Sequence, residues 1–224
     1  NIFLDCGARS AKEVKDMGIE VGNVVTYKDT FMTLNKRFFV GRALDNRIGG
    51  FIIAEVARLL KENKKKLPFG LYITNAVQEE VGLRGAQMIT ETIRPDVAIV
   101  TDVTHDTHTP MINKIKEGDC AMEKGPVVTF GPSVQNNLLK LIIDTAKKNK
   151  INIQRAAASR STGTDTDAFA FNTGGVASAL ISLPLRYMHT TVETVAQKDV
   201  EGVIKLIYNS LLNIKNNHDF RYLK

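Results

Sequence analysis

The chain has 224 residues, of which 43% are hydrophobic, so it can bury the core of one large domain. Its apolar runs are too short to span a bilayer and its first residues do not form a signal-peptide pattern, which predicts no membrane partner. The net charge of +6 comes largely from lysines in expected helix tails, and the chain lacks Trp, which argues against nucleic acid as a partner. Two cysteines are too few for a disulfide framework, so we expect a reducing, cytoplasmic setting.

The first 28 residues differ in pattern from the rest. We expect two short strands there, over residues 1–8 and 22–27, on either side of a short helix over residues 10–18. These residues therefore resemble the end of a small β-rich module.

Strands and helices alternate from about residue 30 onward. The strands are expected over residues 37–44, 69–77, 96–102, 152–158 and 176–184. The helices are expected over residues 46–63, 85–93, 133–149 and 198–216. This alternation predicts an α/β fold in which helices cover both faces of a central sheet.

Glu79 and Glu80 stand side by side directly after the apolar run at 69–77. In isolation such a pair is more often a solvated turn than a site. However, other ligand-type residues also follow expected strands: Asp45, Asp102 and His189. In an open α/β sheet the carboxyl ends of the strands face one crevice. Four carboxylates that converged there without a cation would repel one another at a high cost, so the pattern predicts a divalent metal site. Carboxylates together with an imidazole suit zinc, cobalt or manganese.

Five segments in this order resemble the TET-type di-metal aminopeptidases, also called the glutamyl aminopeptidase family, some members of which were once labelled endoglucanases. The segments are ALDNRIGG, QEEVGLRGA, TDVTHDTHTP, TGTDTDAFAF and LPLRYMHTTVE. The resemblance covers nearly the whole chain. It implies a mixed central sheet with helices on both faces, as in di-zinc exopeptidases, and two divalent ions per subunit, zinc or cobalt.

The resemblance also implies a role for each residue of the site. Asp45 matches the carboxylate that bridges both metals, and the Asp45–Asn46 peptide bond is expected to be cis. Glu80 and His189 match the ligands of one metal, and Asp102 matches a ligand of the other. Glu79 matches the general base. Asp165 in the Gly-Thr-Asp turn matches a residue lining the site, and Arg84 is a weaker candidate for the substrate pocket.

One motif of the family has no counterpart in these 224 residues. The family's remaining ligand His lies in a His-x-Asp motif before an inserted β domain, N-terminal to the bridging Asp. Residues 1–28 are therefore expected to be the end of that inserted dimerisation domain, and residues 29–224 the catalytic domain, with the N-terminal part of both absent. His105 and His108 follow Asp102 closely, but we do not expect either to replace the missing ligand.

The implied activity is hydrolysis of N-terminal residues from peptides, with self-association into dimers and a twelve-subunit shell. Three alternatives remain open: a di-metal deacylase or carboxypeptidase of the same fold, a glycosidase that uses two carboxylates without metal, and a truncated, inactive assembly subunit. For the aminopeptidase, we expect a broad preference for neutral or apolar residues, with leucyl substrates cleaved best. Arg84 would instead favour an acidic residue if it lay in the pocket.

The segment TGTDTDAF also has a purely local interpretation. A Thr or Asp there can accept hydrogen bonds from the first free amides of a helix that begins at DAFAF. This interpretation is compatible with a role at the site.

Overall fold

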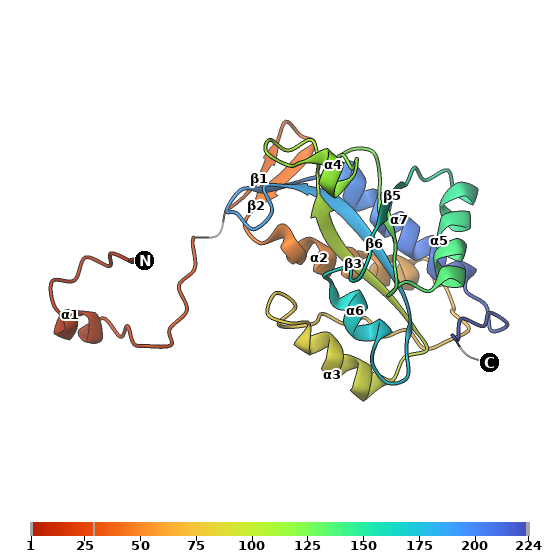
Figure 1. Cartoon of the computed structure of the whole chain (residues 1–224), viewed down its shortest axis with the longest axis horizontal. Coiled ribbons are helices and arrows are strands. Elements are labelled where there is room, and N and C mark those ends of the chain that lie inside the picture. The colour runs from red at the N-terminus through yellow and green to blue at the C-terminus, as the bar shows by residue number, and fades with distance from the viewer. Residues whose placement is uncertain (1, 29, 223–224) are drawn as a thin grey trace.

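The computed structural model describes residues 2–28 and 30–222, and within them seven strands form one mixed sheet (Figure 1). The strands are β1 (Phe31–Leu34), β2 (Phe38–Gly41), β3 (Val97–His105), β4 (Val127–Phe130), β5 (Gln154–Ala157), β6 (Ala177–Arg186) and β7 (Glu193–Ala196). They lie in the order β1-β2-β7-β6-β4-β5, and β3 pairs with β6 outside this path. The mixed α/β sheet is the fold class predicted from the sequence.

The two longest strands form the centre of the sheet. β3 and β6 pair in parallel from Val97 opposite Ala177 to His105 opposite Leu185. All of β6 except Arg186 is buried, because helices cover both faces of this strand. Its continuous apolar run predicted such a position. β1, β4 and β7 were not predicted, although β2 and β5, which also have four residues each, were.

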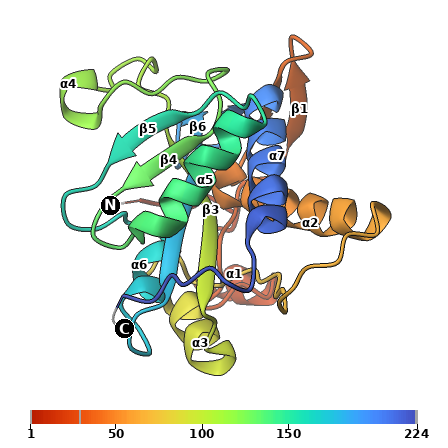
Figure 2. The same ribbon diagram turned by 90° about the vertical axis from the view of Figure 1, so that its right-hand side faces the viewer.

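The described part of the chain contains seven helices, of which α1 lies away from the sheet (Figure 1). They are α1 (Ala11–Asp16), α2 (Leu44–Glu62), α3 (Arg84–Ile93), α4 (Lys114–Glu117), α5 (Asn136–Lys148), α6 (Asp165–Ala170) and α7 (Gln197–Asn213). α2, α5 and α7 pack together on one face, and Figure 2 shows α5 beside α7. α3 and α6 pack against each other on the opposite face, next to β3.

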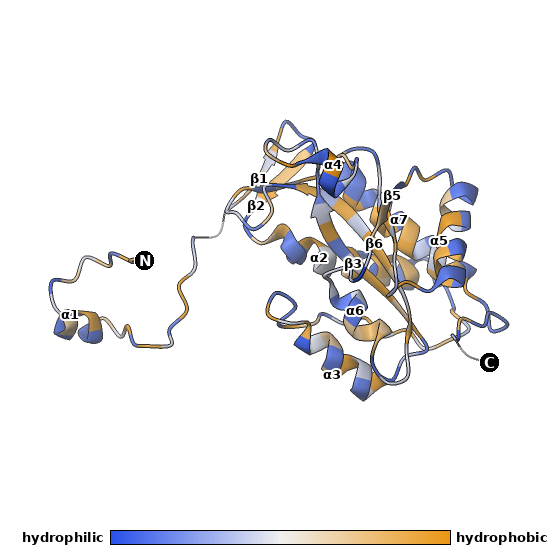
Figure 3. Ribbon diagram, in the orientation of Figure 1, coloured by the Kyte–Doolittle hydropathy of each residue, from blue (hydrophilic) through white to orange (hydrophobic). Residues whose placement is uncertain are grey.

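Helix α2 shows why the sequence pattern predicted these helices well. Ile48, Ile52 and Val56 recur at a spacing of four residues, which places them on one side of the helix, and all three are buried. The same alternation of apolar and polar residues is visible along α5 in Figure 3. Among residues 2–28 and 30–222, no helix has the length and apolar character needed to cross a bilayer.

The expected strands near the N-terminus are not present among residues 2–28. Asn1, with which the first of them was expected to begin, lies outside the described residues. The segment extends away from the sheet (Figure 1), and its apolar side chains are exposed, Val21 and Val24 among them. A strand forms only where a neighbour accepts and donates its backbone hydrogen bonds, and this segment pairs with no strand in the described part of the chain. The expected helix is present as α1, with Ser10 accepting a hydrogen bond from the Glu13 amide.

The strand expected over residues 69–77 is also a wrong prediction. The segment is extended but pairs with no strand of the described sheet. Its apolar residues are correspondingly open to solvent, with Leu71 at 38% and Ile73 at 43% exposure. β-branched and aromatic residues indicate a preference for extended backbone, but they do not specify a pairing partner. The segment instead forms one wall of a large cleft.

Candidate metal centre

A cleft of about 1540 Å³ opens beside β3. Residues 69–76 and 78–80 form one wall, and β3, α2, the ends of α3 and α7, the start of α6 and the C-terminal segment also line the cleft. Asp45, Glu79, Glu80 and Asp165 line the cleft, whereas Arg84, which begins α3 and is exposed, is not part of its lining. The cleft therefore brings together most of the residues that the sequence pattern singled out.

Asp45 is held at a break in the first turn of α2. The backbone is left-handed at Ala43 and the Asp45–Asn46 peptide bond is cis, as the resemblance implied. Regular helix begins only after Asn46, whose side-chain oxygen accepts a hydrogen bond from the Gly49 amide at 2.9 Å. The Asn46 amide nitrogen donates to the Thr101 carbonyl of β3, also at 2.9 Å. Asn46 thus fixes this break to the strand that carries Asp102.

Glu79 and Glu80 lie in a tight turn that Gly85 closes. The Gly85 amide donates to the Val77 carbonyl at 2.9 Å, and the Leu83 amide donates to the Glu79 carbonyl at 3.0 Å. A Cβ atom on residue 85 would lie 2.4 Å from the Val77 carbonyl oxygen, so only glycine fits there. Of the two adjacent carboxylates in this turn, that of Glu80 belongs to a cluster with Asp45 and His189, and that of Glu79 does not.

His189 joins Asp45 and Glu80 in one cluster of ligand-type atoms. Its Nε2 atom lies 3.1 Å from an Asp45 oxygen and 3.6 Å from a Glu80 oxygen. One oxygen or nitrogen from each of the three side chains lies within 4.8 Å of the other two. Two carboxylates and an imidazole at such spacing are a ligand set that suits zinc. Glu79 and Asp102 do not belong to this three-residue group.

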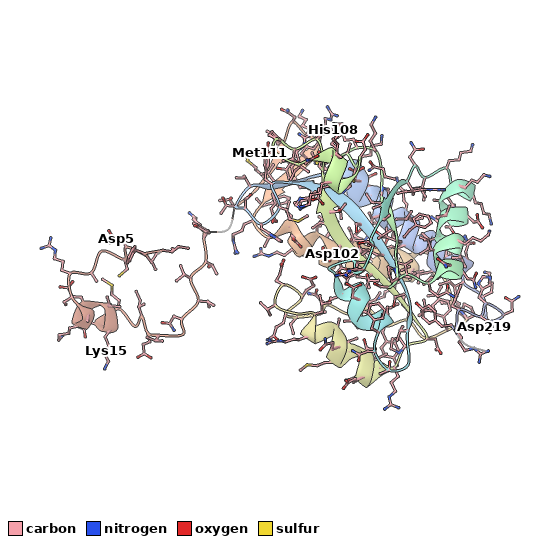
Figure 4. The ribbon with its side chains drawn as sticks, in the orientation of Figure 1. Asp5, Lys15, Asp102, His108, Met111 and Asp219 are labelled. Carbon is pink, nitrogen blue, oxygen red and sulfur yellow. The ribbon has the colours of Figure 1, made fainter. Side chains whose placement is uncertain are left out.

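Asp102 lies inside β3, not at the end of a strand. The strand continues to His105, because residues after Asp102 keep pairing with β6. The side chain is 6% exposed, and Figure 4 shows it in the interior of the molecule. One Asp102 oxygen accepts a hydrogen bond from the Val103 amide at 2.8 Å. The sequence therefore predicted the end of this strand too early, although Asp102 does lie close enough to Asp45 for their charges to interact.

Asp165 is the first residue of α6, and Thr164 caps that helix; the local interpretation of TGTDTDAF predicted such a cap but placed the start of the helix later, at Asp167. One of the Asp165 carboxyl oxygens is buried and has no hydrogen-bond partner within the described residues. An unpaired buried carboxyl oxygen is costly unless a donor reaches it.

Burial and mutual repulsion raise the pKa of these carboxyls. Burial is the main cause in each case, and it raises the pKa of Asp45 to about 6, with further repulsion from Glu80 and Glu193. The pKa of Glu79 rises to about 7 and that of Asp102 to about 8, again with repulsion from neighbouring carboxylates. Desolvation also raises the pKa of Asp165 to about 6. A concentration of shifted carboxyls in one cleft is typical of a functional site, and a cation would favour their charged forms.

His105 and His108 are not members of the ligand group. His108 lies at the surface beside Met111 and far from Asp102 in Figure 4. Its Nε2 atom lies 3.2 Å from an Asp119 oxygen and 2.8 Å from the Lys114 nitrogen. That neither histidine replaces a metal ligand stays a prediction.

The shifted carboxyls predict how stability depends on pH without metal. The free energy of unfolding is expected to fall as the pH rises from about 4 to about 8, since the folded pKa values lie above the ordinary ones. In that range the folded state binds more protons than the unfolded state, so stability is lost as those protons leave. Zinc or cobalt added at the upper end is expected to restore it.

Thermal denaturation with and without a chelator across this pH range measures the effect. The Asp102→Asn variant lacks the carboxyl with the highest of these pKa values and is expected to decline less steeply. A metal-free protein whose melting temperature stays level or rises over the same range contradicts this prediction.

The amino-acid sequence of the chain matches a known protein family. Residues 1–206 match the M42 glutamyl aminopeptidase family. The chain is 36% identical to the lysyl aminopeptidase of Pyrococcus furiosus over 215 residues, which are 96% of this chain and 60% of that protein.

Solved structures agree with the sequence comparison. A TET aminopeptidase from a Thaumarchaeota archaeon superimposes with a TM-score of 0.86 at 33% identity, covering 92% of this chain and 58% of that one. The TET1 peptidase of Pyrococcus horikoshii, which can assemble into a tetrahedron or a large octahedral shell, superimposes with a TM-score of 0.77 at 28% identity. That match covers 92% of this chain and 59% of the other. The chain thus spans less than two thirds of the length of these relatives.

Proposed function

The chain belongs to the M42 glutamyl aminopeptidase family, and we therefore propose that its cleft hydrolyses the N-terminal peptide bond of peptides with the help of divalent metal ions. The observation that carries this proposal is the cluster of Asp45, Glu80 and His189, of which Asp45 and Glu80 line a cleft that opens to solvent. The remaining carboxylates, Glu79 and Asp102, adjoin the cluster without belonging to it.

The donor set fits one ion directly. Asp45, Glu80 and His189 would hold it, and Asp45 with Asp102 would hold a second, because the charges of those two carboxylates interact. Oxygen and imidazole donors without thiolate suit zinc or cobalt. When bound, such ions polarise the scissile carbonyl and lower the pKa of the attacking water.

Glu79 would carry the proton in this reaction. It takes a proton from the water as the new carbon–oxygen bond forms, and it returns that proton to the departing amine as the carbon–nitrogen bond breaks. Glu79 is only partly buried and is not bound into the three-residue cluster, so its carboxylate is available to substrate. The turn closed by Gly85 thus separates a ligand from a base at adjacent positions.

Asp165 would bind the substrate's free α-amino group. Its carboxyl group lines the cleft, and a carboxylate there can accept hydrogen bonds from an ammonium. Recognition of the amino group would confine cleavage to N-terminal residues. Arg84 has weaker support as a substrate contact, because it does not line the cleft.

For the N-terminal residue of the substrate, the proposal is a broad preference for neutral or apolar side chains. One relative is named a lysyl and another a glutamyl aminopeptidase, and lysyl and glutamyl residues have opposite charge. Similarity to these relatives therefore does not determine the substrate preference. The wall of the cleft at residues 69–77 presents Leu71 and Ile73, which suits an apolar side chain.

Metal content and a substrate panel test this function together. Elemental analysis is expected to find two ions per chain. With added zinc or cobalt, chromogenic substrates that carry a leucyl residue are expected to be cleaved faster than those that carry a lysyl or glutamyl residue. A protein that binds less than about one ion contradicts the metal site. A glutamyl substrate that outpaces leucyl about tenfold, or about 1.4 kcal/mol in transition-state binding, overturns the preference and favours Arg84 as its cause. Release of acetate from N-acetyl amino acids in place of aminopeptidase activity would favour a deacylase.

Assembly into dimers and a twelve-subunit shell is proposed from kinship with TET peptidases. The exposed apolar residues of the segment before β1, such as Val24 and Tyr27, support burial of that segment against another surface. Light scattering that shows a monomer would contradict this assembly.

We also propose that the protein is located in the cytoplasm, because both cysteines are free.

A further inference from the structure

Glu193 connects the two loops that carry the central ligands. It is the first residue of β7, pairs with Gly41 of β2, and is 2% exposed. One of its carboxyl oxygens accepts a hydrogen bond from the Asp45 amide at 3.0 Å. The other accepts one from the His189 amide at 2.7 Å. Both oxygens of one buried carboxyl are therefore used on the backbones of two ligand residues.

The two loops have little other regular structure at these points. His189 has a left-handed backbone with φ of +61°, and the loop to Asp45 contains left-handed Ala43. Such conformations are unfavourable for residues other than glycine and persist only where the surroundings hold them. The side chains of Asp45 and His189 meet at 3.1 Å although the residues come from distant parts of the sequence. The Glu193 side chain contacts the backbones of both, and so it links the two loops directly.

We propose that Glu193 is a positioning residue that holds the backbones of Asp45 and His189 at the spacing at which their side chains bind one divalent ion. This inference rests on the proposed function, because it takes both residues as ligands. Glu193 leaves the side chains of both ligands free, since it accepts these hydrogen bonds from their backbone amides. Groups that orient metal ligands in this way commonly change metal affinity by about 10–100-fold when they are replaced.

The alternative is that Glu193 only stabilises the fold, and Asp199 offers a matched control. Asp199 is fully buried in α7 and accepts hydrogen bonds from the Glu123 and Gly125 amides at 2.6 and 2.9 Å. It therefore has the same chemistry as Glu193, a buried carboxyl bound to two backbone amides. Neither Glu193 nor Asp199 lines the cleft.

The experiment compares metal binding by the wild-type protein and three variants. Glu193→Gln turns one acceptor into a donor that faces an amide, and Glu193→Asp keeps the charge but shortens the reach. Asp199→Asn is the control. Zinc is titrated into each metal-free protein by calorimetry, thermal denaturation records stability, and the visible spectrum of the cobalt-loaded protein reports ligand geometry.

Both Glu193 variants are expected to bind zinc about 10–100-fold more weakly and to show an altered cobalt spectrum. Asp199→Asn is expected to lose thermal stability while its zinc affinity and cobalt spectrum stay like those of the wild type. The positioning role is overturned if the Glu193 variants match Asp199→Asn in affinity and spectrum, or if Glu193→Asp binds like the wild type. If the wild type itself binds no ion, the metal site of the proposed function is wrong.

A measurement on the unmodified protein covers the case in which the Glu193 variants do not fold. In the metal-free wild type the amides of Asp45 and His189 are expected to exchange slowly with deuterium, because Glu193 already holds them. His189 makes this test sensitive, since its side chain is 64% exposed. Fast exchange of both amides before metal is added overturns the proposal.

Discussion

Glu79→Gln is expected to lower kcat by about 10²–10⁴-fold while leaving the metal content near that of the wild type. The substitution keeps the size of the side chain but removes its capacity to accept and return a proton. Glu79 is outside the three-residue ligand cluster, so its loss does not open a coordination position there.

Initial rates on a leucyl substrate and elemental analysis of the same preparation measure both quantities. Glu91→Gln is a matched control, because Glu91 is an exposed glutamate on α3. It is expected to change neither turnover nor metal content. If Glu79→Gln keeps most of its turnover, or loses metal along with activity, then Glu79 is not the base.

The elements with long, regular patterns were the ones that the sequence predicted well. α2 and β6 have enough apolar residues at helical spacing or in one run to specify both their type and their burial. The segment at 69–77 was wrong for a physical reason: residue type reports the preference of a backbone for extension, whereas a strand also requires a partner. Four-residue strands were predicted less consistently: β2 and β5 were found from the sequence, whereas β1, β4 and β7 were missed.

The candidate ligands could be found from sequence because they are chemically distinctive and follow apolar runs. Asp45, Glu80 and His189 meet in space as predicted from their places along the chain. The residues that orient them could not be found in this way. Glu193 and Asn46 act through backbone amides and carbonyls, and those contacts exist only once β2, β3 and β7 are placed in one sheet.

Asp45→Asn is expected to have opposite effects on metal binding and on the stability of the metal-free protein. The Asp45 carboxylate lies closer to the His189 ring than Glu80 does, and we propose that it is shared by both ions. An amide in its place removes one negative charge and replaces a carboxylate metal ligand with a weaker one. The metal content is therefore expected to fall well below that of the wild type. Activity is expected to fall at least as far as in Glu79→Gln.

Without metal, the same substitution removes a buried carboxylate whose ionisation destabilises the folded state. The Asp45 side chain is 10% exposed, and burial together with Glu80 and Glu193 raises its pKa to about 6, so ionising it above that pH destabilises the folded chain. An asparagine side chain at this position carries no charge, and the metal-free variant is therefore expected to melt at a higher temperature than the metal-free wild type at a pH of about 8.

Elemental analysis after dialysis and thermal denaturation in a chelator at that pH measure the two effects, with Glu79→Gln as the comparison for metal content. Equal metal content in the two variants would contradict the separate roles of base and ligand. A metal-free Asp45→Asn protein less stable than the wild type would show that the hydrogen bond from His189 outweighs the repulsion at Asp45. Stability that rises as metal affinity falls is the expected mark of a carboxylate whose position in the fold is favourable only with a cation bound.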